Sequence, residues 1–182
     1  MNKLFFTLIT ILFQAQLLIA QPLIDRAGKA SFYSEAPLED IEAVNETLLG
    51  AIDLDKGTLA VSMSIKGFHF DNSLMEEHFN ENYLESDKYP KAQFSGKIKD
   101  FSNLDFSKAG SFEAVVEGLI EIHGVKKTLK TIVRFESSAD RLLANTQFDI
   151  VVDDFDVDIP KLVIKNIAEV VEVKASFNFK KD

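Results

Sequence analysis

The chain has 182 residues, enough for one domain with a sizeable apolar core, and its formal net charge at pH 7 is −9. An acidic chain lacks the basic surface that phosphate backbones require, so nucleic acid is excluded as an expected partner. The absence of cysteine excludes disulfides, a thiolate nucleophile and a lipid anchor attached through cysteine. Sixteen phenylalanines and no tryptophan indicate a large apolar interior.

Residues 1–20 have the features of a secretory signal peptide. Lys3 supplies the positive start, Leu4 to Phe13 forms the apolar stretch, and Ala20 precedes the expected cleavage site. The alternative is an N-terminal membrane anchor, but the apolar stretch is short for a span and is followed by two glutamines. We therefore expect residues 21–182 to form a single exported domain, periplasmic or secreted, with no stable membrane insertion after cleavage.

The segment before residue 71 alternates apolar and polar residues, a period of two that predicts β-strands. The predicted strands cover residues 30–34, 48–54 and 59–70. The polar run from Glu39 to Glu46 interrupts the alternation. Gly67 shifts its phase so that Phe68 and Phe70 continue the apolar face, which is typical of a β-bulge.

A short helix is predicted over about residues 73–84. Asn72 and Ser73 are favourable N-cap residues, and Ser73 with Glu76 has the spacing of a capping box. One apolar stripe follows, made of Met75, Phe79 and Tyr83. Pro90 excludes helix beyond this point. We expect the helix to brace or plug one end of a β-structure.

Alternation resumes after the helix and continues to the C-terminus. The predicted strands cover residues 92–98, 112–122, 125–136, 144–152 and 171–179, with a helical or irregular link at 162–167. About eight strands with one apolar face each predict an antiparallel sheet with one face towards solvent. Such a sheet buries its apolar face by folding into a sandwich or by closing into a barrel, and alternation does not distinguish the two.

The histidines offer little for catalysis. The spacing of His69, His78 and His123 matches no metal-binding template, and the chain has no nucleophile elbow or phosphate-binding glycine loop. His69 lies opposite Phe68 and Phe70 and is expected to face solvent. His123 belongs to a turn, and His78 is expected to make a capping or core hydrogen bond. We expect no enzyme activity, no metal and no cofactor.

Alternate aspartates precede Pro160 and resemble the first half of a calcium loop. They are Asp154, Asp156 and Asp158. The turn glycine and the closing glutamate of such a loop are missing. A solvated acidic loop is therefore the expected structure.

Two strings resemble the signature of the YceI-like family, and residues Ile167 to Val173 resemble its last strand. The first string comprises Leu74, Met75, His78, Phe79, Lys88, Tyr89, Pro90, Ala92, Phe94 and Gly96. The second comprises Gly118, Leu119, Ile120, Glu121, Ile122, His123, Gly124 and Val125. The resemblance covers nearly all of the chain after residue 27. It implies an all-β fold, an antiparallel eight-stranded lipocalin-like barrel with the short helix at one end.

The resemblance also implies an exported, non-enzymatic carrier that holds a polyisoprenoid or another lipid inside the barrel. The alternative is a structural or protein-interaction barrel whose interior is packed, since any barrel has an apolar interior. The sequence leaves a homodimer open. The candidate ligand-binding residues are Phe32, Met63, Ile65, Phe68, Phe70, Leu74, Met75, His78, Phe79, Phe94, Phe112, Val116, Ile120, Phe135, Phe148, Ile150 and Phe177.

Overall fold

The structure is a computed structural model that describes residues 21–35, 40–159 and 168–181. The predicted signal peptide and the predicted link at 162–167 lie outside these residues and are not tested. Among the helices of the described residues, none has the length and apolar character that crossing a membrane requires.

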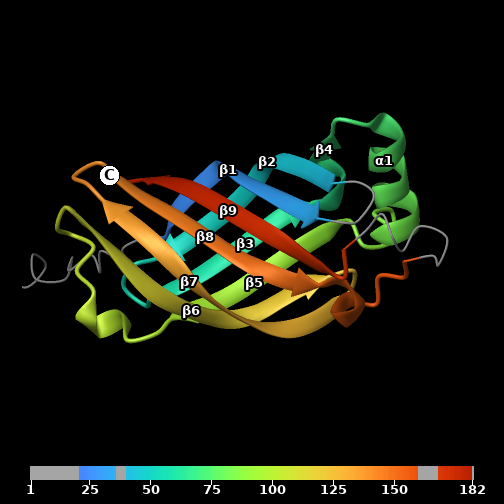
Figure 1. The fold of residues 1–182 in the computed structure, drawn as a ribbon. Helices are drawn as coiled ribbons and strands as arrows, with labels where there is room; N and C mark the ends of the chain where they lie inside the picture. Colours follow the sequence, from blue (N-terminus) through green and yellow to red (C-terminus); the bar gives the residue numbers. More distant parts are fainter. Residues whose placement is uncertain (1–20, 36–39, 160–167, 182) are drawn as a thin grey trace, which may run out of the picture.

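Eight strands close into an antiparallel barrel (Figure 1). They follow one another in the order β1-β9-β8-β7-β6-β5-β3-β2, and β2 pairs with β1 to complete the ring. The bounds are β1 Leu23–Glu35, β2 Asp40–Asp53, β3 Thr58–Ser64, β5 Lys91–Ile98, β6 Gly110–Ile122, β7 Val125–Ser137, β8 Arg141–Val151 and β9 Val170–Lys180. A short strand, β4 (Phe68–Phe70), pairs with β2 outside the ring. Closure confirms the barrel and excludes the sandwich.

The alternation of apolar and polar residues in the sequence appears in the structure as an alternation of buried and exposed side chains. On β6, Ala114, Val116 and Ile120 are buried while Glu113 and Leu119 are exposed. Apolar side chains on the inner face leave water when the sheet closes, and this burial stabilises the ring. The predicted inward faces of the other strands are confirmed in the same way.

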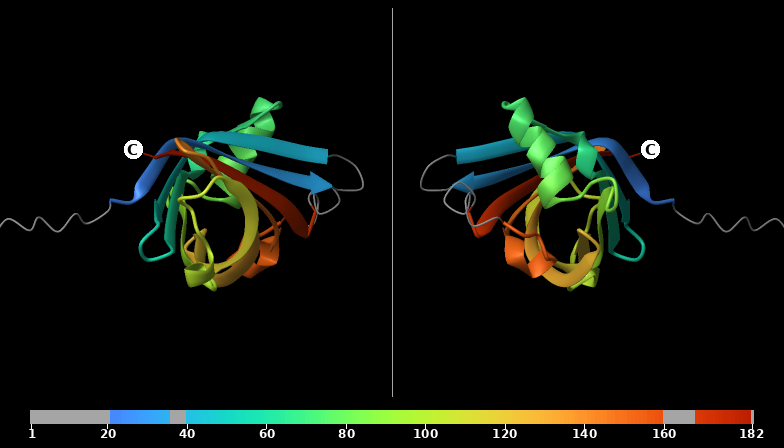
Figure 2. Two further views of the ribbon diagram at one scale, coloured as in Figure 1. Left: turned by 90° about the vertical axis from the view of Figure 1, so that its left-hand side faces the viewer. Right: turned by 90° about the vertical axis from the view of Figure 1, so that its right-hand side faces the viewer.

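The predicted helix and Asn72 as its N-cap are confirmed, but the predicted capping box is not formed. Helix α1 (Ser73–His78) continues into a wider π-helical turn, η2 (Phe79–Tyr83), at the rim of the barrel (Figure 2). Asn72 is the N-cap, and its side-chain oxygen accepts a hydrogen bond from Leu74 N at 3.0 Å. The Glu76 carboxylate accepts one from Phe70 N at 3.1 Å, so it bonds the chain before the helix. The capping box predicted for Ser73 and Glu76 is therefore wrong.

The polar run at 39–46 does not interrupt the sheet, because β2 begins at Asp40. Ile41, Ala43 and Asn45 alternate inward and are buried. Asn45 looks like a break in an apolar pattern, yet it is fully buried and its amide donates to Ser64 O at 2.8 Å. A satisfied amide can occupy an inward position at little cost.

The predicted bulge at Gly67 is also corrected. A 3-10 turn, η1 (Ile65–Gly67), separates β3 from β4. β3 pairs with β2 and β5, whereas β4 pairs with β2 alone, at Ala43 to Asn45. The phase of the apolar pattern shifts because the chain leaves one pairing and starts another.

Two glycines face each other across the β5–β6 pairing. Gly96 pairs with Gly118 in the ladder. A Cβ atom at Gly118 would overlap Ser95 O and Gly96 Cα. Only glycine leaves room for the opposing backbone at this pair.

A packed aromatic core fills the end of the barrel opposite α1. Phe106, Phe112 and Phe135 lie with ring centroids 4.9 to 5.7 Å apart. Phe135 and Phe179 are 0% and 1% exposed. Packed side chains therefore fill the interior of the barrel at this end.

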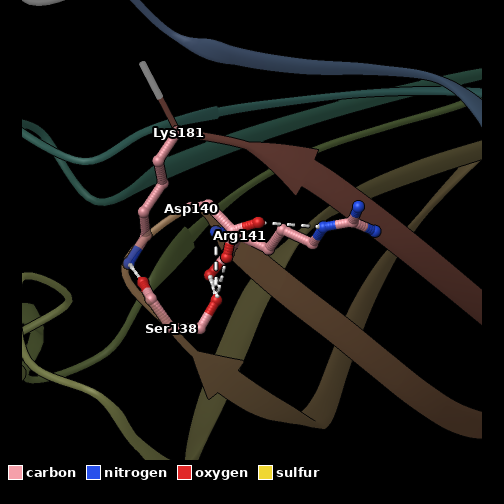
Figure 3. Close-up of polar contacts among 4 residues, drawn as sticks. All are labelled: Ser138, Asp140, Arg141 and Lys181. Carbon is pink, nitrogen blue, oxygen red and sulfur yellow. Dashed lines mark hydrogen bonds and ion pairs between the residues drawn. The ribbon is translucent and has the colours of Figure 1, made fainter.

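Polar contacts seal the same end around the turn between β7 and β8 (Figure 3). Lys181, after β9, donates hydrogen bonds to Phe106 O at 2.7 Å and to Ser138 O at 2.8 Å. Asp140 accepts from Ser138 Oγ at 2.9 Å, and this bond lowers the pKa of the Asp140 carboxyl. Lys181 is thus tied to two loops.

Candidate functional site

The other half of the barrel contains an apolar cavity of about 260 Å³. Its walls come from all eight strands of the ring, and its end is formed by α1, η2 and the segment after β8. Met75, Phe79 and Tyr83 line it from the helical side, as the predicted stripe requires. Phe155 and Val157 line it from the segment after β8.

Thirteen of the predicted ligand-binding residues line this cavity. They are Phe32, Met63, Ile65, Phe68, Phe70, Met75, Phe79, Phe94, Val116, Ile120, Phe148, Ile150 and Phe177. Their placement follows from two features that the sequence shows: the inward phase of each strand and the stripe of the helix. Contact with a ligand stays a prediction.

Four predicted residues lie elsewhere. Leu74 is 55% exposed, and His78 is exposed as well. The helix turns Met75 and Phe79 towards the barrel, so Leu74 and His78 point away from it. The capping or core hydrogen bond predicted for His78 is therefore wrong.

Phe112 and Phe135 do point inward, but they belong to the packed core at the opposite end. Alternation gives the direction of a side chain across the sheet. It does not give the position of that side chain along the barrel axis.

The wall of the cavity carries no charged side chain among the described residues. The hydroxyl groups of Thr131 and Thr146 lie 2.9 Å apart, and Thr146 also donates to Ile132 O at 2.9 Å. These two hydroxyls already have partners within the protein. The cavity therefore suits an uncharged apolar chain, because an unpaired charge inside it would lose its hydration without compensation.

A cluster of four phenylalanines attaches the helical segment to the strands. The Phe79 ring lies 5.5 Å from Phe32, 5.5 Å from Phe68 and 5.0 Å from Phe70, measured between centroids. Stacked and edge-on rings at such distances attract each other beyond simple burial. Phe79 therefore holds α1 and η2 at the end of the cavity.

A family model of the YceI-like domain matches residues 30–179, most of the chain. The chain belongs to the YceI-like family. No curated protein matches it.

Solved structures with the same YceI-like fold include three from different bacteria. A polyisoprenoid binding domain from Saccharophagus degradans is 15% identical, with a TM-score of 0.76 over 90% of this chain and 99% of that one. BcnA from Burkholderia cenocepacia is 17% identical, with a TM-score of 0.69 over 83% and 95%. The YCEI protein of Campylobacter jejuni is 14% identical, with a TM-score of 0.59 over 75% and 81%. At these identities the similarity shows the fold alone.

The predicted acidic loop forms part of the cavity wall. Phe155 and Val157 are buried against it, while Asp154 faces outward and forms an ion pair with Lys127 at 3.1 Å. Among the described residues no group of metal-ligating side chains gathers. The prediction of a solvated loop is thus half wrong: the aspartates alternate with apolar residues, and this period of two was the signal for an inward face.

The two family strings meet beside the same cavity. His123 is 9% exposed and lies in the turn between β6 and β7, as predicted, with a φ of 52°. Its Nδ1 is 3.1 Å from Phe155 O, and its Nε2 is 2.9 Å from a Glu85 carboxylate oxygen. The Tyr89 ring packs edge-on against the imidazole at 4.5 Å.

The neighbouring glycine explains part of the second string. Gly124 has a φ of 77°, and a Cβ there would lie 2.7 Å from Tyr89. Both the backbone conformation and the close ring require glycine at this position. The sequence placed His123 in a turn but gave no sign of its buried partners, because they come from segments far away in the chain.

Proposed function

We propose that the mature protein is an exported, non-enzymatic carrier that holds a long apolar ligand, a polyisoprenoid or another lipid, inside the barrel. The uncharged cavity is the observation that carries this proposal. Moving one methylene group from water into such a cavity is favourable by about 0.8 kcal/mol of free energy. A charged head group would remain at the solvent side of α1 and η2.

The cavity supports the carrier over a barrel with a packed interior. A fully packed barrel would continue the aromatic core of the opposite end through its whole length. The polyisoprenoid binding domain from Saccharophagus degradans, which has the same fold, supports the class of ligand. Export rests on residues 1–20, and the intact mass of protein recovered outside the cytoplasm tests it by locating the mature N-terminus. Light scattering tests the homodimer.

Native mass spectrometry of the exported protein, followed by organic extraction, tests the carrier. We expect an added mass that matches a long-chain lipid. A bare protein mass that stays unchanged after incubation with polyisoprenoids, quinones and fatty acids would contradict the proposal.

A matched pair of variants localises the ligand. Ala175→Phe adds a ring to the cavity wall, whereas Ala60→Phe adds the same ring to an exposed position on β3. We expect the first to lose the bound lipid and the second to keep it. Loss in both variants, or in neither, would place the ligand elsewhere.

A further inference from the structure

His123 contacts two segments that line the cavity. Its Nδ1 faces the carbonyl oxygen of Phe155, whose side chain is 5% exposed and lines the cavity. Its Nε2 faces Glu85, which directly follows the cavity-lining Leu84. These segments are far apart in the sequence: Glu85 follows η2, and Phe155 is the last residue of η4 (Val152–Phe155). The imidazole therefore ties them together at the end of the cavity.

The partners of the ring define how many protons the contact needs. A carbonyl oxygen can only accept, so Nδ1 must carry a hydrogen. An ionised carboxylate can also only accept, so Nε2 must carry one as well. The hydrogen bond with His123 lowers the pKa of the Glu85 carboxyl, which keeps Glu85 ionised at mildly acidic pH. Both contacts together require the doubly protonated, cationic ring.

We propose that His123 is a proton-dependent latch that controls how fast the cavity exchanges its ligand. The inference rests on the proposed carrier function. While the ring holds both protons, Phe155 and Glu85 stay joined over the end of the cavity. When the ring loses one proton as pH rises, one of the two contacts is lost and the ligand leaves faster.

Several charged groups near His123 have ion-pair partners of their own. Glu85 has a second cation, Lys88, at 3.6 Å, which can take the carboxylate once the ring is neutral. Tyr89 packs against the imidazole and lies beneath the Lys88 ammonium group. On the remaining elements, Asp154 of η4 pairs with Lys127 of β7, and Glu121 of β6 pairs with Lys126 of β7.

The pH direction follows from the two partners. Glu85, with its lowered pKa, contributes to the latch above its own titration and loses this contribution only in acid. The imidazole makes both contacts only while both of its nitrogens carry a hydrogen. Retention is therefore strongest in mildly acidic solution and weakens towards alkaline pH.

Stopped-flow release of retinol, a fluorescent and uncharged isoprenoid, tests the latch between pH 5.5 and 8. For the native sequence we expect release about tenfold faster at pH 8, the effect of losing one hydrogen bond to a charged group. His123→Asn keeps a residue that tolerates a positive φ but cannot bridge both partners. This variant should release retinol fast at every pH.

Glu85→Gln separates a latch from a merely structural histidine. The glutamine amide can donate to a neutral Nε2 or accept from a protonated one. This variant should retain retinol at every pH and lose the pH dependence. His69→Asn is the matched control, because His69 also lies beside a carboxylate, Glu76 at 3.6 Å, but is 76% exposed. It should behave like the native protein.

The outcomes distinguish the latch from the carrier function. Retinol that binds but leaves at a rate independent of pH, or a pH dependence that persists in Glu85→Gln, overturns the latch. If retinol does not bind at all, the latch is tested instead by the amide protection factors of the ligand-free protein. Protection of Val152 and Asp156, whose amides are hydrogen-bonded next to Phe155, should fall with rising pH in the native protein but not in Glu85→Gln. Equal protection across this pH range overturns the latch without reference to any ligand.

Discussion

At the scale of single residues, a buried polar side chain helps to set the pairing of the strands. Asn45 has no exposed surface, and all its side-chain contacts lie within the protein. Its amide nitrogen donates to Ser64 O, and its oxygen accepts from the backbone N of Thr47 at 2.9 Å and from its hydroxyl at 2.8 Å. The side chain therefore fixes the register of β2 against the end of β3.

Asn45→Ala should lower the free energy of unfolding by about 2–4 kcal/mol, because it removes a fully buried amide together with its hydrogen bonds to Ser64 O and Thr47 N. Urea denaturation measures this change. Asn178→Ala on β9 is the control, since Asn178 is exposed and should change the free energy by less than about 0.5 kcal/mol. Similar values for the two variants would contradict the role given to Asn45.

At the scale of elements, the helical segment depends on tertiary contacts for its place. Helix α1 has only six residues, too short to be stable by itself, and none of them is buried. The Phe79 ring at the start of η2 supplies contacts with β1 and β4. The Phe79 ring is therefore one of the tertiary contacts that hold the segment at the rim.

Phe79→Ala should destabilise the protein by about 2–3 kcal/mol, somewhat less than for a fully buried phenylalanine because Phe79 is half-buried. Leu74→Ala removes an apolar side chain from the same helix at an exposed position and should cost less than about 0.5 kcal/mol. Thermal unfolding followed by circular dichroism compares the two. Equal losses would mean that α1 does not pack as the structure has it.

At the scale of the whole molecule, folding and the proposed ligand binding both depend on the apolar inner face of the ring. Ile120 is 9% exposed and lines the cavity, whereas its neighbour Leu119 is 54% exposed on the outer face. The two side chains differ in little except the side of the sheet. They therefore allow a direct test of the inward assignment.

Ile120→Asp should prevent folding or ligand retention, because it places a charge without a partner in the apolar interior. Leu119→Asp should leave both nearly unchanged. Circular dichroism and lipid extraction report the two effects. A folded, lipid-loaded Ile120→Asp protein would refute the inward orientation of β6.

Much of this architecture could be predicted from local patterns, and the rest could not for physical reasons. Period-two alternation gave the strands and their inward faces, and one stripe gave the helix. Closure came from the family resemblance, since a local pattern is the same in a sandwich and a barrel. The depth of Phe135 along the axis and the partners of His123 depend on residues distant in sequence, which no local pattern encodes.

The two ends of the barrel are closed in different ways, and under the proposed carrier function this difference sets the direction in which a ligand enters and leaves. One end is sealed by interlocked aromatic rings and by Lys181. The other is closed by segments that a few contacts hold together. A carrier built as a blind tunnel must load its cargo tail first and deliver it head first. A receiving enzyme or membrane would therefore meet the head group before any of the tail is exposed to water.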